Sequence, residues 1–494
     1  RYGEQPHADA LRRLVACSEF AGAVVLRDTQ WFLDNIGSFD DPPDAAGLEA
    51  IVGKDTDVES VKRILRRYRN RFMLHVLWRE VFGLASLDET LYSLSDLAHH
   101  MLDVATRCAQ RALEPRYGVV RDRHGSKVPL VILGMGKLGG LELNYSSDVD
   151  LIFLYPHEGE TDGAKCVSAQ EYFGRLSRQV IALLDEMTVD GFVFRIDTRL
   201  RPFGDSGPPV VSFGALESYL LQHGRDWERY AYVKARIVGP WPGDEVADDL
   251  YNNLIRPFVY RRYIDYGVFE SLREMHAMIA TEVRKRELQD NVKLGPGGIR
   301  EAEFVVQSLQ LVRGGSDAAL RTQALQEVLP SLVNSRGLES READRLRTAY
   351  RFLRRVENFI QAMQDRQTHD LPRDEAGQAR LCVAMGYADW PALLAEIDAQ
   401  RTAIVEQFDR VAFRDSDNDA PLLERLGIAW DAGLEHEAWQ ELLAETGFKE
   451  ADALATTLVA FANAAGTRQL DAASRERLGR FVPRLLAEVA ASDR

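Results

Sequence analysis

Two apolar runs, at residues 130–133 and 149–155, predict neighbouring strands joined by a glycine-rich and polar stretch. The second run opens with Asp148 and Asp150, which are two positions apart. Alternate side chains of a strand share a face, so these carboxylates point to one side while the apolar residues beside them point into a core. The pattern therefore predicts a strand, a glycine turn and a second strand that begins with a pair of carboxylates.

Helical periodicity predicts most of the remaining chain. Apolar residues recur at intervals of three and four in segments 58–83, 168–187 and 347–372, and segment 87–113 predicts two further helices. In the first segment, the predicted buried positions are Val61, Leu65, Tyr68, Phe72 and Val76, and the predicted solvent-facing positions are Arg66, Arg67, Arg69 and Arg71. His369, in a polar run at the end of segment 347–372, is assigned to the surface or to a capping role.

Segment 191–204 alternates apolar and polar residues and predicts a third strand. Asp197 becomes the natural third carboxylate if this strand lies beside the one with the carboxylate pair. Arg199 and Arg201 follow at strand spacing, and a guanidinium offers phosphate a fixed fork of donors, so both are candidates for phosphate contacts. Pairing with neighbouring carboxylates or with solvent remains the alternative for both arginines.

Segments 223–239 and 256–286 are also predicted to be helical. In the first, the predicted inward positions are Trp227, Tyr230 and Val233, and the predicted outward positions are Arg225, Glu228, Arg229, Lys234 and Arg236. A linker is expected around 414–420, followed by short helices without a chemical motif.

A second glycine-rich turn, at 295–298, follows Lys293 and leads into a helix that opens with Glu301 and Glu303. Acidic residues in a first helical turn are common partners of the helix dipole. Residues two apart on a helix point in nearly opposite directions, so at most one of these glutamates is expected to reach the carboxylate cluster.

The composition is that of an ordinary globular chain: 494 residues, 46% hydrophobic and 28% charged, enough for several domains. The net charge of −15 argues against a nucleic-acid partner. No apolar run predicts a membrane span, no secretory leader is visible, and the four cysteines lack metal or disulfide spacing. We therefore expect a cytoplasmic protein with no nucleic-acid or membrane partner, and the start at Arg1 leads us to expect a fragment or a processed chain.

Carboxylates beside a glycine turn indicate phosphate chemistry. Mg²⁺ prefers one or two protein carboxylates together with phosphate oxygens and water, and free backbone N–H groups suit phosphate. Asp148, Asp150 and Asp197 together would hold two such ions. The ATPase loop GxxxxGK[ST] is absent, and the turn runs into a strand instead of the long helix of a dinucleotide-binding fold.

These motifs resemble the amino-terminal half of the bifunctional glutamine synthetase adenylyltransferase/adenylyl-removing enzyme of bacteria. The resemblance rests, in this order, on GMGKLGGLELNYSSDVDLIF, RIDTRLRPFGDSGP, GRDWERYAYVKAR, RPFVYRRYIDY and KLGPGGIREAEFVVQ, and it covers roughly residues 57–413. That family carries two nucleotidyltransferase domains of the DNA polymerase beta type around a central regulatory helical region. A single such acidic motif is present here.

The resemblance implies an α+β fold, with a polymerase beta-type nucleotidyltransferase core sheet embedded in a predominantly helical chain. The implied domains are an N-terminal helical region (1–113), the nucleotidyltransferase core (114–240), a helical domain packing on the core (241–415) and the start of the regulatory helical region (416–494).

The implied activity is the Mg²⁺-dependent removal of AMP from the adenylylated tyrosine of glutamine synthetase by phosphorolysis, which yields ADP. The implied partners are glutamine synthetase and the PII signalling protein in its uridylylated form. By position, Asp148 and Asp150 match the metal-binding pair and Asp197 fits the third acid; Gly136, Lys137, Gly139 and Gly140 match the phosphate loop, with Ser147 at its exit. Arg199, Arg201 and Lys293 are the candidates for holding the incoming phosphate, a hypothesis from the residues alone.

Three alternatives remain open. The chain could instead adenylylate glutamine synthetase from ATP, because both directions need the same carboxylates. A uridylyltransferase of the PII protein shares the fold, although its glycine loop and surroundings differ. The chain could also be a non-catalytic module that docks glutamine synthetase or PII.

Overall fold

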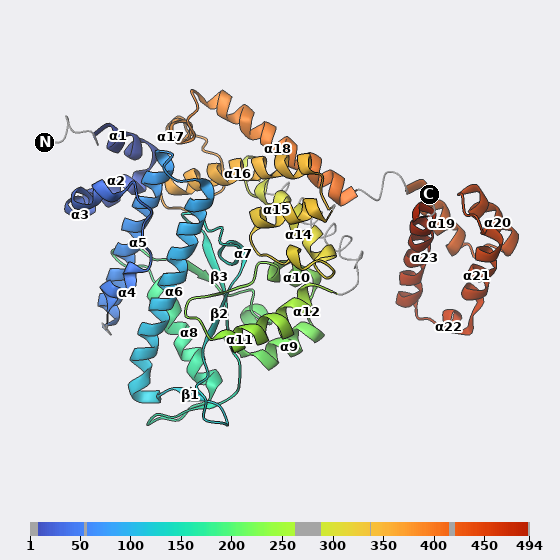
Figure 1. Ribbon diagram of the computed structural model, residues 1–494, viewed down its shortest axis with the longest axis horizontal. Helices are drawn as coiled ribbons and strands as arrows, with labels where there is room; N and C mark the ends of the chain where they lie inside the picture. The colour runs from blue at the N-terminus through green and yellow to red at the C-terminus, as the bar shows by residue number, and fades with distance from the viewer. Residues whose placement is uncertain (1–7, 54–56, 262–287, 336, 414–419, 493–494) are drawn as a thin grey trace. The chain divides into compact units, whose positions relative to one another are not determined.

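The computed structural model describes residues 8–53, 57–261, 288–335, 337–413 and 420–492 (Figure 1). The chain divides into two compact units, Arg1–Phe408 and Asp409–Arg494. Most of the helix set predicted at 256–286 and nearly all of the linker predicted at 414–420 lie outside the described residues.

A mixed five-stranded sheet forms the centre of the first unit. The strand order is β5 (Arg195–Asp197), β3 (Asp148–Tyr155), β2 (Val131–Gly134) and β7 (Arg236–Val238), with β6 (Val210–Ser212) also paired to β3. β2 runs antiparallel to β3 and β7, whereas β5 and β6 run parallel to β3. A separate two-stranded ribbon joins β1 (Val120–Arg121) to β4 (Glu160–Thr161). The two predicted apolar strands are confirmed, and the third predicted strand is shortened to three residues.

Segment 223–239, predicted to be one helix, forms a helix and then a strand. α10 (Asp226–Tyr232) ends before β7, whose Ile237 is the partner of Leu133 in the sheet. Trp227, predicted to be buried, is 43% exposed, whereas Glu228, Arg229 and Lys234, predicted to face solvent, are all buried. Tertiary pairing with β2 overrides the local helical pattern, because the strand completes backbone hydrogen bonds that a helix would leave on the sheet edge.

Long helices pack beside the sheet in the first half of this unit (Figure 1). α6 (Leu87–Tyr117) packs against α5 (Val58–Val81) and α8 (Ala169–Asp185). α6 is one helix where two were predicted; Ser86 caps its start by accepting from Glu89 N, and Gly118 ends it at φ +69°. The shorter helices before α5 are α1 (Ala8–Cys17), α2 (Glu19–Arg27), α3 (Thr29–Asn35) and α4 (Gly47–Val52).

Two arginines of α5 that were predicted to face solvent are buried. Arg66 is 0% exposed and donates to the carbonyl oxygens of Gly191 (2.8 Å) and Leu183 (3.0 Å). Arg69 is 2% exposed and forms a two-pronged ion pair with Asp365. Backbone carbonyl oxygens and a distant carboxylate supply their partners, so the prediction from periodicity was wrong for these two residues.

The second half of the unit is helical. α14 (Ile299–Arg313), α15 (Leu325–Asn334) and α16 (Ser340–Ala362) pack on one another. α16 carries a fully buried polar face, described below. The other helices are α9 (Phe213–Gln222), α11 (Asp244–Asp248), α12 (Arg256–Val259), α17 (Glu375–Met385) and α18 (Trp390–Phe413).

The second unit is a small helical bundle with its own apolar core, which includes Leu426, Trp439, Leu443 and Leu486. Its helices are α19 (Ala420–Asp431), α20 (His436–Glu445), α21 (Ala451–Asn463), α22 (Ala465–Arg468) and α23 (Ala472–Ser492). The chain as a whole is thus predominantly helical with a small mixed sheet, which confirms the predicted α+β class. Across the described residues, we find no helix with the length and apolar character needed to cross a bilayer.

Candidate active site

The structure brings the three predicted carboxylates onto neighbouring strands. β3 and β5 pair in parallel, with Asp150 opposite Asp197 and Asp148 opposite Arg195. Paired strands lie about 4.8 Å apart and residues in register share a face, so the three carboxylates lie on one face of the sheet. Asp148 Oδ1 accepts from Arg195 Nε (3.0 Å) and Asp197 Oδ2 accepts from Arg199 Nε (2.8 Å).

Asp150 is the electrostatically exceptional member of the three. Its pKa is raised to about 6, first by burial and then by the charges of Asp197 and Asp148, against the opposing charges of Lys293 and Arg199. Its carboxylate has no hydrogen-bond or ion-pair partner among the described residues, whereas the hydrogen bond from Arg199 lowers the pKa of Asp197. An unpaired and mostly buried carboxylate beside two others is a place where positive charge is favoured.

No metal-binding group is preformed in this part of the chain. Within the described ranges, no three His, Cys, Asp or Glu side chains are arranged to hold an ion. Arginines engage two of the three carboxylates, Asp148 and Asp197. The predicted metal site therefore stays a prediction.

The glycine turn lies directly beside Asp150. α7 (Gly136–Gly139) follows β2, and Gly136 has φ +52°, a conformation that favours glycine. A Cβ at Gly136 would lie 3.1 Å from Asp150 Oδ2. Gly139 and Gly140 serve packing instead, since a Cβ at Gly139 would overlap the carbonyl oxygen of Lys234 and one at Gly140 would lie 3.0 Å from a Glu142 oxygen.

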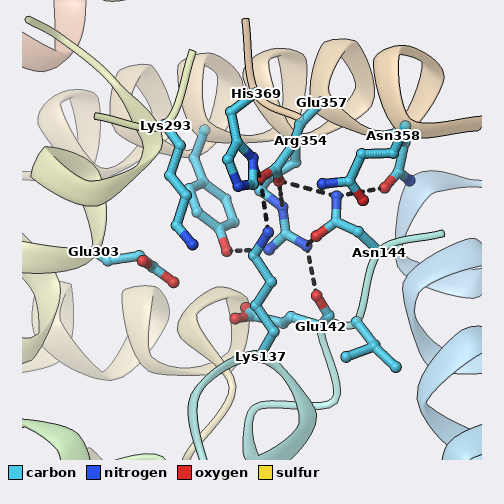
Figure 2. Close-up of polar contacts among 12 residues, drawn as sticks. Lys137, Glu142, Asn144, Lys293, Glu303, Arg354, Glu357, Asn358 and His369 are labelled. Atoms are coloured by element: carbon cyan, nitrogen blue, oxygen red, sulfur yellow. Dashed lines mark hydrogen bonds and ion pairs between the residues drawn. The ribbon is translucent and has the colours of Figure 1, made fainter. Parts of the chain in front are cut away.

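Lys137, predicted to belong to the phosphate loop, turns away from the carboxylates and toward α16. Its Nζ lies 2.7 Å from Glu357 Oε1 (Figure 2). The pKa of Lys137 is lowered to about 7, chiefly by burial; the charge of Glu357 opposes this lowering, and the charges of Lys293 and Arg354 add to it. In this structure the lysine therefore holds the glycine turn to α16 through its contact with Glu357.

Glu357 is the centre of a buried polar network (Figure 2). It is 0% exposed, and besides Lys137 it contacts Asn144 Nδ2 (2.9 Å), Arg354 Nε (3.2 Å) and His369 Nδ1 (2.8 Å). The cations around it hold the pKa of Glu357 well below its ordinary value despite complete burial. His369, predicted to lie at the surface, is thus a partner of a buried carboxylate.

One face of α16 anchors the segment that leads into Asp148. Arg354 donates to Asn144 Oδ1 (2.7 Å), Asn144 donates to Asn358 Oδ1 (2.7 Å), and Gln361 Oε1 accepts from Ser146 N (2.9 Å). These contacts fix the chain between the glycine turn and β3. Four polar residues at helical spacing on a predicted buried face were the available signal, and the sequence reasoning missed them; they are Arg354, Glu357, Asn358 and Gln361, all 0% exposed.

The remaining residues of the predicted site are more scattered. Arg199 and Arg201 lie in turns after β5, not on a strand, and Arg201 donates to the carbonyl (2.9 Å) and hydroxyl (2.8 Å) oxygens of Thr198. Ser147 lies before β3 and its buried hydroxyl has no hydrogen-bond partner among the described residues.

Lys293, Glu301 and Glu303 come from the second glycine-rich turn and α14. Glu303 forms a 2.6 Å ion pair with Lys234, and Glu301 accepts from Gly297 N (2.9 Å). Glu303 therefore faces Lys234 instead of the carboxylate cluster. Lys293 is half-buried and lies close enough to Asp150 to lower the pKa of that carboxyl.

A mixed sheet with carboxylates in register beside a glycine turn is an arrangement typical of proteins that bind ligands carrying phosphate. The family model described as glutamate-ammonia ligase adenylyltransferase matches residues 8–248, and that described as GlnD PII-uridylyltransferase matches residues 273–412.

Relatives along nearly the whole chain narrow this class. The "Bifunctional glutamine synthetase adenylyltransferase/adenylyl-removing enzyme" of Thioalkalivibrio sulfidiphilus is 43% identical over 98% of this chain and 51% of its own length. The proteins of the same name from Shewanella loihica and Pseudomonas aeruginosa are both 42% identical, over 97% and 96% of this chain. The chain belongs to this family of bifunctional enzymes. It spans about half the length of the curated relatives it matches.

Proposed function

We propose that this chain is the adenylyl-removing half of such an enzyme, the amino-terminal one. Its reaction would be the phosphorolysis of the adenylylated tyrosine of glutamine synthetase. The observation that carries the proposal is the register pairing of Asp150 with Asp197 beside Gly136, where the phosphate of a bound AMP group would lie. The names of the relatives supply the substrate, glutamine synthetase, and include both the addition and the removal of the adenylyl group, so the direction is part of the proposal.

The reaction balances without a nucleophilic side chain. An oxygen of inorganic phosphate forms a bond to the phosphorus of the AMP group, and the bond from that phosphorus to the tyrosine oxygen breaks. The products are ADP and a tyrosine that takes up a proton. Transfer of this kind depends on positioning and on stabilising charge, so it requires no Ser, Cys or His nucleophile.

The carboxylates fit a divalent cation. Asp150 is mostly buried and next to Asp197, and burial together with the charges of Asp197 and Asp148 raises its pKa, so a bound cation would be favoured there. Mg²⁺ on these oxygens and on the phosphates would neutralise charge on the transferred group when bound. Asp148 would have to release Arg195 before it could bind a cation, and a second ion would require this rearrangement.

The other predicted residues have supporting roles in this proposal. Gly136 lets the backbone approach the phosphate, and Lys137 holds the turn through Glu357. Arg199, Arg201 and Lys293 are the cations near the carboxylates that could hold the incoming phosphate. Glutamine synthetase would be the protein substrate, and the PII protein, in its uridylylated form, a regulatory partner.

The second candidate is adenylylation of glutamine synthetase from ATP, which the other half of the relatives' printed name favours. The two directions are separated by supplying the chain with adenylylated glutamine synthetase, phosphate and Mg²⁺, and separately with unmodified synthetase, ATP and Mg²⁺. The proposal expects ADP in the first mixture and no ATP consumption in the second. The reverse pattern refutes it, and inactivity in both mixtures favours a docking module.

A further inference from the structure

Arg199, Arg201 and Lys293 are the three cations predicted to hold the phosphate, and the two arginines are already engaged. Arg199 directs its guanidinium at Asp197, with Nε and Nη2 lying 2.8 and 2.5 Å from Oδ2. Arg201 donates twice to Thr198 and lies 3.6 Å from Asp205. Either arginine would have to give up these contacts before it could bind a substrate.

Lys293 differs from both arginines because its ammonium group has no hydrogen-bond or ion-pair partner among the described residues. Figure 2 shows its side chain extending into the space between Lys137 and Glu303. Glu303, the nearest labelled carboxylate on that side, is already paired at 2.6 Å with Lys234. The ammonium therefore remains available.

Hydrogen bonds and a close glycine contact hold the backbone around Lys293 in place. Asn291 Oδ1 accepts from the backbone N–H groups of Lys293 (3.1 Å) and Leu294 (2.8 Å). A Cβ at Gly298 would lie 2.7 Å from the carbonyl oxygen of Lys293, so only glycine permits this close approach. A lysine held at its base in this way loses little further backbone freedom when it binds a ligand.

Charge counting identifies Lys293 as the surplus cation. The buried network holds four cationic side chains (Lys137, Lys234, Lys293 and Arg354) and three carboxylates (Glu142, Glu303 and Glu357). Every cation except Lys293 has an ion pair within 3.2 Å. The charge of Lys293 acts both on Asp150 and on Lys137, so its ammonium lies near both groups.

We propose that the Lys293 ammonium is the receptor for the attacking oxyanion, inorganic phosphate, in the reaction proposed above. The site supplies what a phosphate dianion needs: an unpaired donor with a fixed base, surplus positive charge, and closeness to the carboxylates beside which the AMP phosphorus would lie. This inference rests on the proposed function. A role for Lys293 in merely offsetting the charge of Asp150 is the competing explanation.

The test compares Lys293→Ala with Lys293→Arg and with Lys127→Ala, the last at an exposed lysine in an isolated β-bridge with Arg121. Adenylylated glutamine synthetase and Mg²⁺ are held constant while inorganic phosphate is varied, and ADP is measured. Loss of one charge-assisted contact predicts a KM for phosphate raised about 10- to 100-fold in Lys293→Ala, with kcat at saturating phosphate changed by less than about threefold. Lys293→Arg should recover part of the loss, and Lys127→Ala should match the unmodified chain.

Binding is measured apart from activity, by the rise in unfolding temperature with added phosphate at fixed ionic strength, chloride being exchanged for phosphate. Lys293→Ala should need about 10- to 100-fold more phosphate for the same rise. An unchanged KM for phosphate, or a fall in kcat alone, overturns the assignment and supports charge offset. If the unmodified chain makes no ADP yet binds phosphate through Lys293, the proposed function fails while the oxyanion site stands.

Discussion

Replacing Glu357 by glutamine tests whether the buried network holds the candidate active site together. The amide keeps the shape of the side chain and can still accept from Asn144, but it removes the negative charge that faces Lys137, Arg354 and His369. The two buried cations Lys137 and Arg354 would then lack the counter-charge of Glu357.

The magnitude follows from that loss. Removing one partner of a buried ion pair costs about 3–5 kcal/mol, because the other charge stays buried without compensation. Lys137 can relieve part of this cost by losing its proton, since its pKa is already about 7. We therefore expect Glu357→Gln to lower the free energy of unfolding of the first unit by about 3 kcal/mol at pH 7. Because the pKa of Glu357 is lowered in the fold, the stabilisation that it provides is present above pH 4.5 and is lost as the pH falls toward its folded pKa.

Glu80 is the matched control with the opposite sign. It is 3% exposed and accepts from Tyr145 Oη (2.7 Å), but no cation forms an ion pair with it among the described residues. Burial raises its pKa to about 7 from an ordinary 4.5, so the folded state loses stability as the pH rises between these values, by up to about 3 kcal/mol. Glu80→Gln should therefore stabilise the chain at pH 8 and have little effect below pH 4.5.

Denaturant unfolding followed by near-ultraviolet circular dichroism at pH 5 and pH 8 measures both variants. Opposite signs at pH 8 are the expected result. If both substitutions shift the unfolding midpoint in the same direction by similar amounts, the distinction between a charge-compensated and an uncompensated buried glutamate is refuted.

Two further substitutions test the local geometry. Gly136→Ala should reduce ADP formation severely, because it combines about 1–2 kcal/mol of backbone strain with a methyl group 3.1 Å from Asp150 Oδ2. The control is Gly386→Ala, at φ +80° with open space around it, which should carry the same strain and leave activity unchanged. Arg66→Met should lower the free energy of unfolding by about 2–4 kcal/mol, because buried carbonyl oxygens lose their donor. Arg63→Met, at an exposed position of the same helix, should change it by less than about 0.5 kcal/mol. Equal effects of the two substitutions in denaturant unfolding would contradict this reasoning.

The strands that carry the carboxylates could be predicted because their pattern is local. Apolar runs predicted strands at 130–133 and 149–155, and the structure has them at Val131–Gly134 and Asp148–Tyr155. The turn between them contains too many glycines for a long helix. The face shared by Asp148 and Asp150 follows from strand geometry alone. The pairing of Asp150 with Asp197 required the additional assumption that the two strands are neighbours, which the structure confirms.

Strand β7 could not be predicted because its conformation is decided by its partner. Arg236–Val238 is short and follows a helix, and its pairing with β2 joins residues about a hundred positions apart in the chain. A periodicity of three or four residues in 223–239 fits a continuous helix equally well. Nonlocal hydrogen bonds decided the outcome.

The buried charges were missed for a different reason. A charged residue is usually exposed, so Arg66, Lys234 and His369 were assigned to solvent or left polar. Each is buried or half-buried against a carbonyl or carboxylate oxygen from another segment, such as Glu142 for Lys234. Partners of this kind cannot be identified from the sequence around one residue.

The central claim is that Asp150, paired in register with Asp197, supports the transfer of AMP from glutamine synthetase to phosphate. The most direct measurement is ADP formation from adenylylated glutamine synthetase, phosphate and Mg²⁺ by Asp150→Asn, compared with the unmodified chain and with Asp344→Asn at an exposed position. We predict a fall of roughly a thousandfold for Asp150→Asn, the equivalent of several kcal/mol of lost charge stabilisation, and no change for Asp344→Asn. ADP formation by Asp150→Asn at the rate of the unmodified chain would contradict the account.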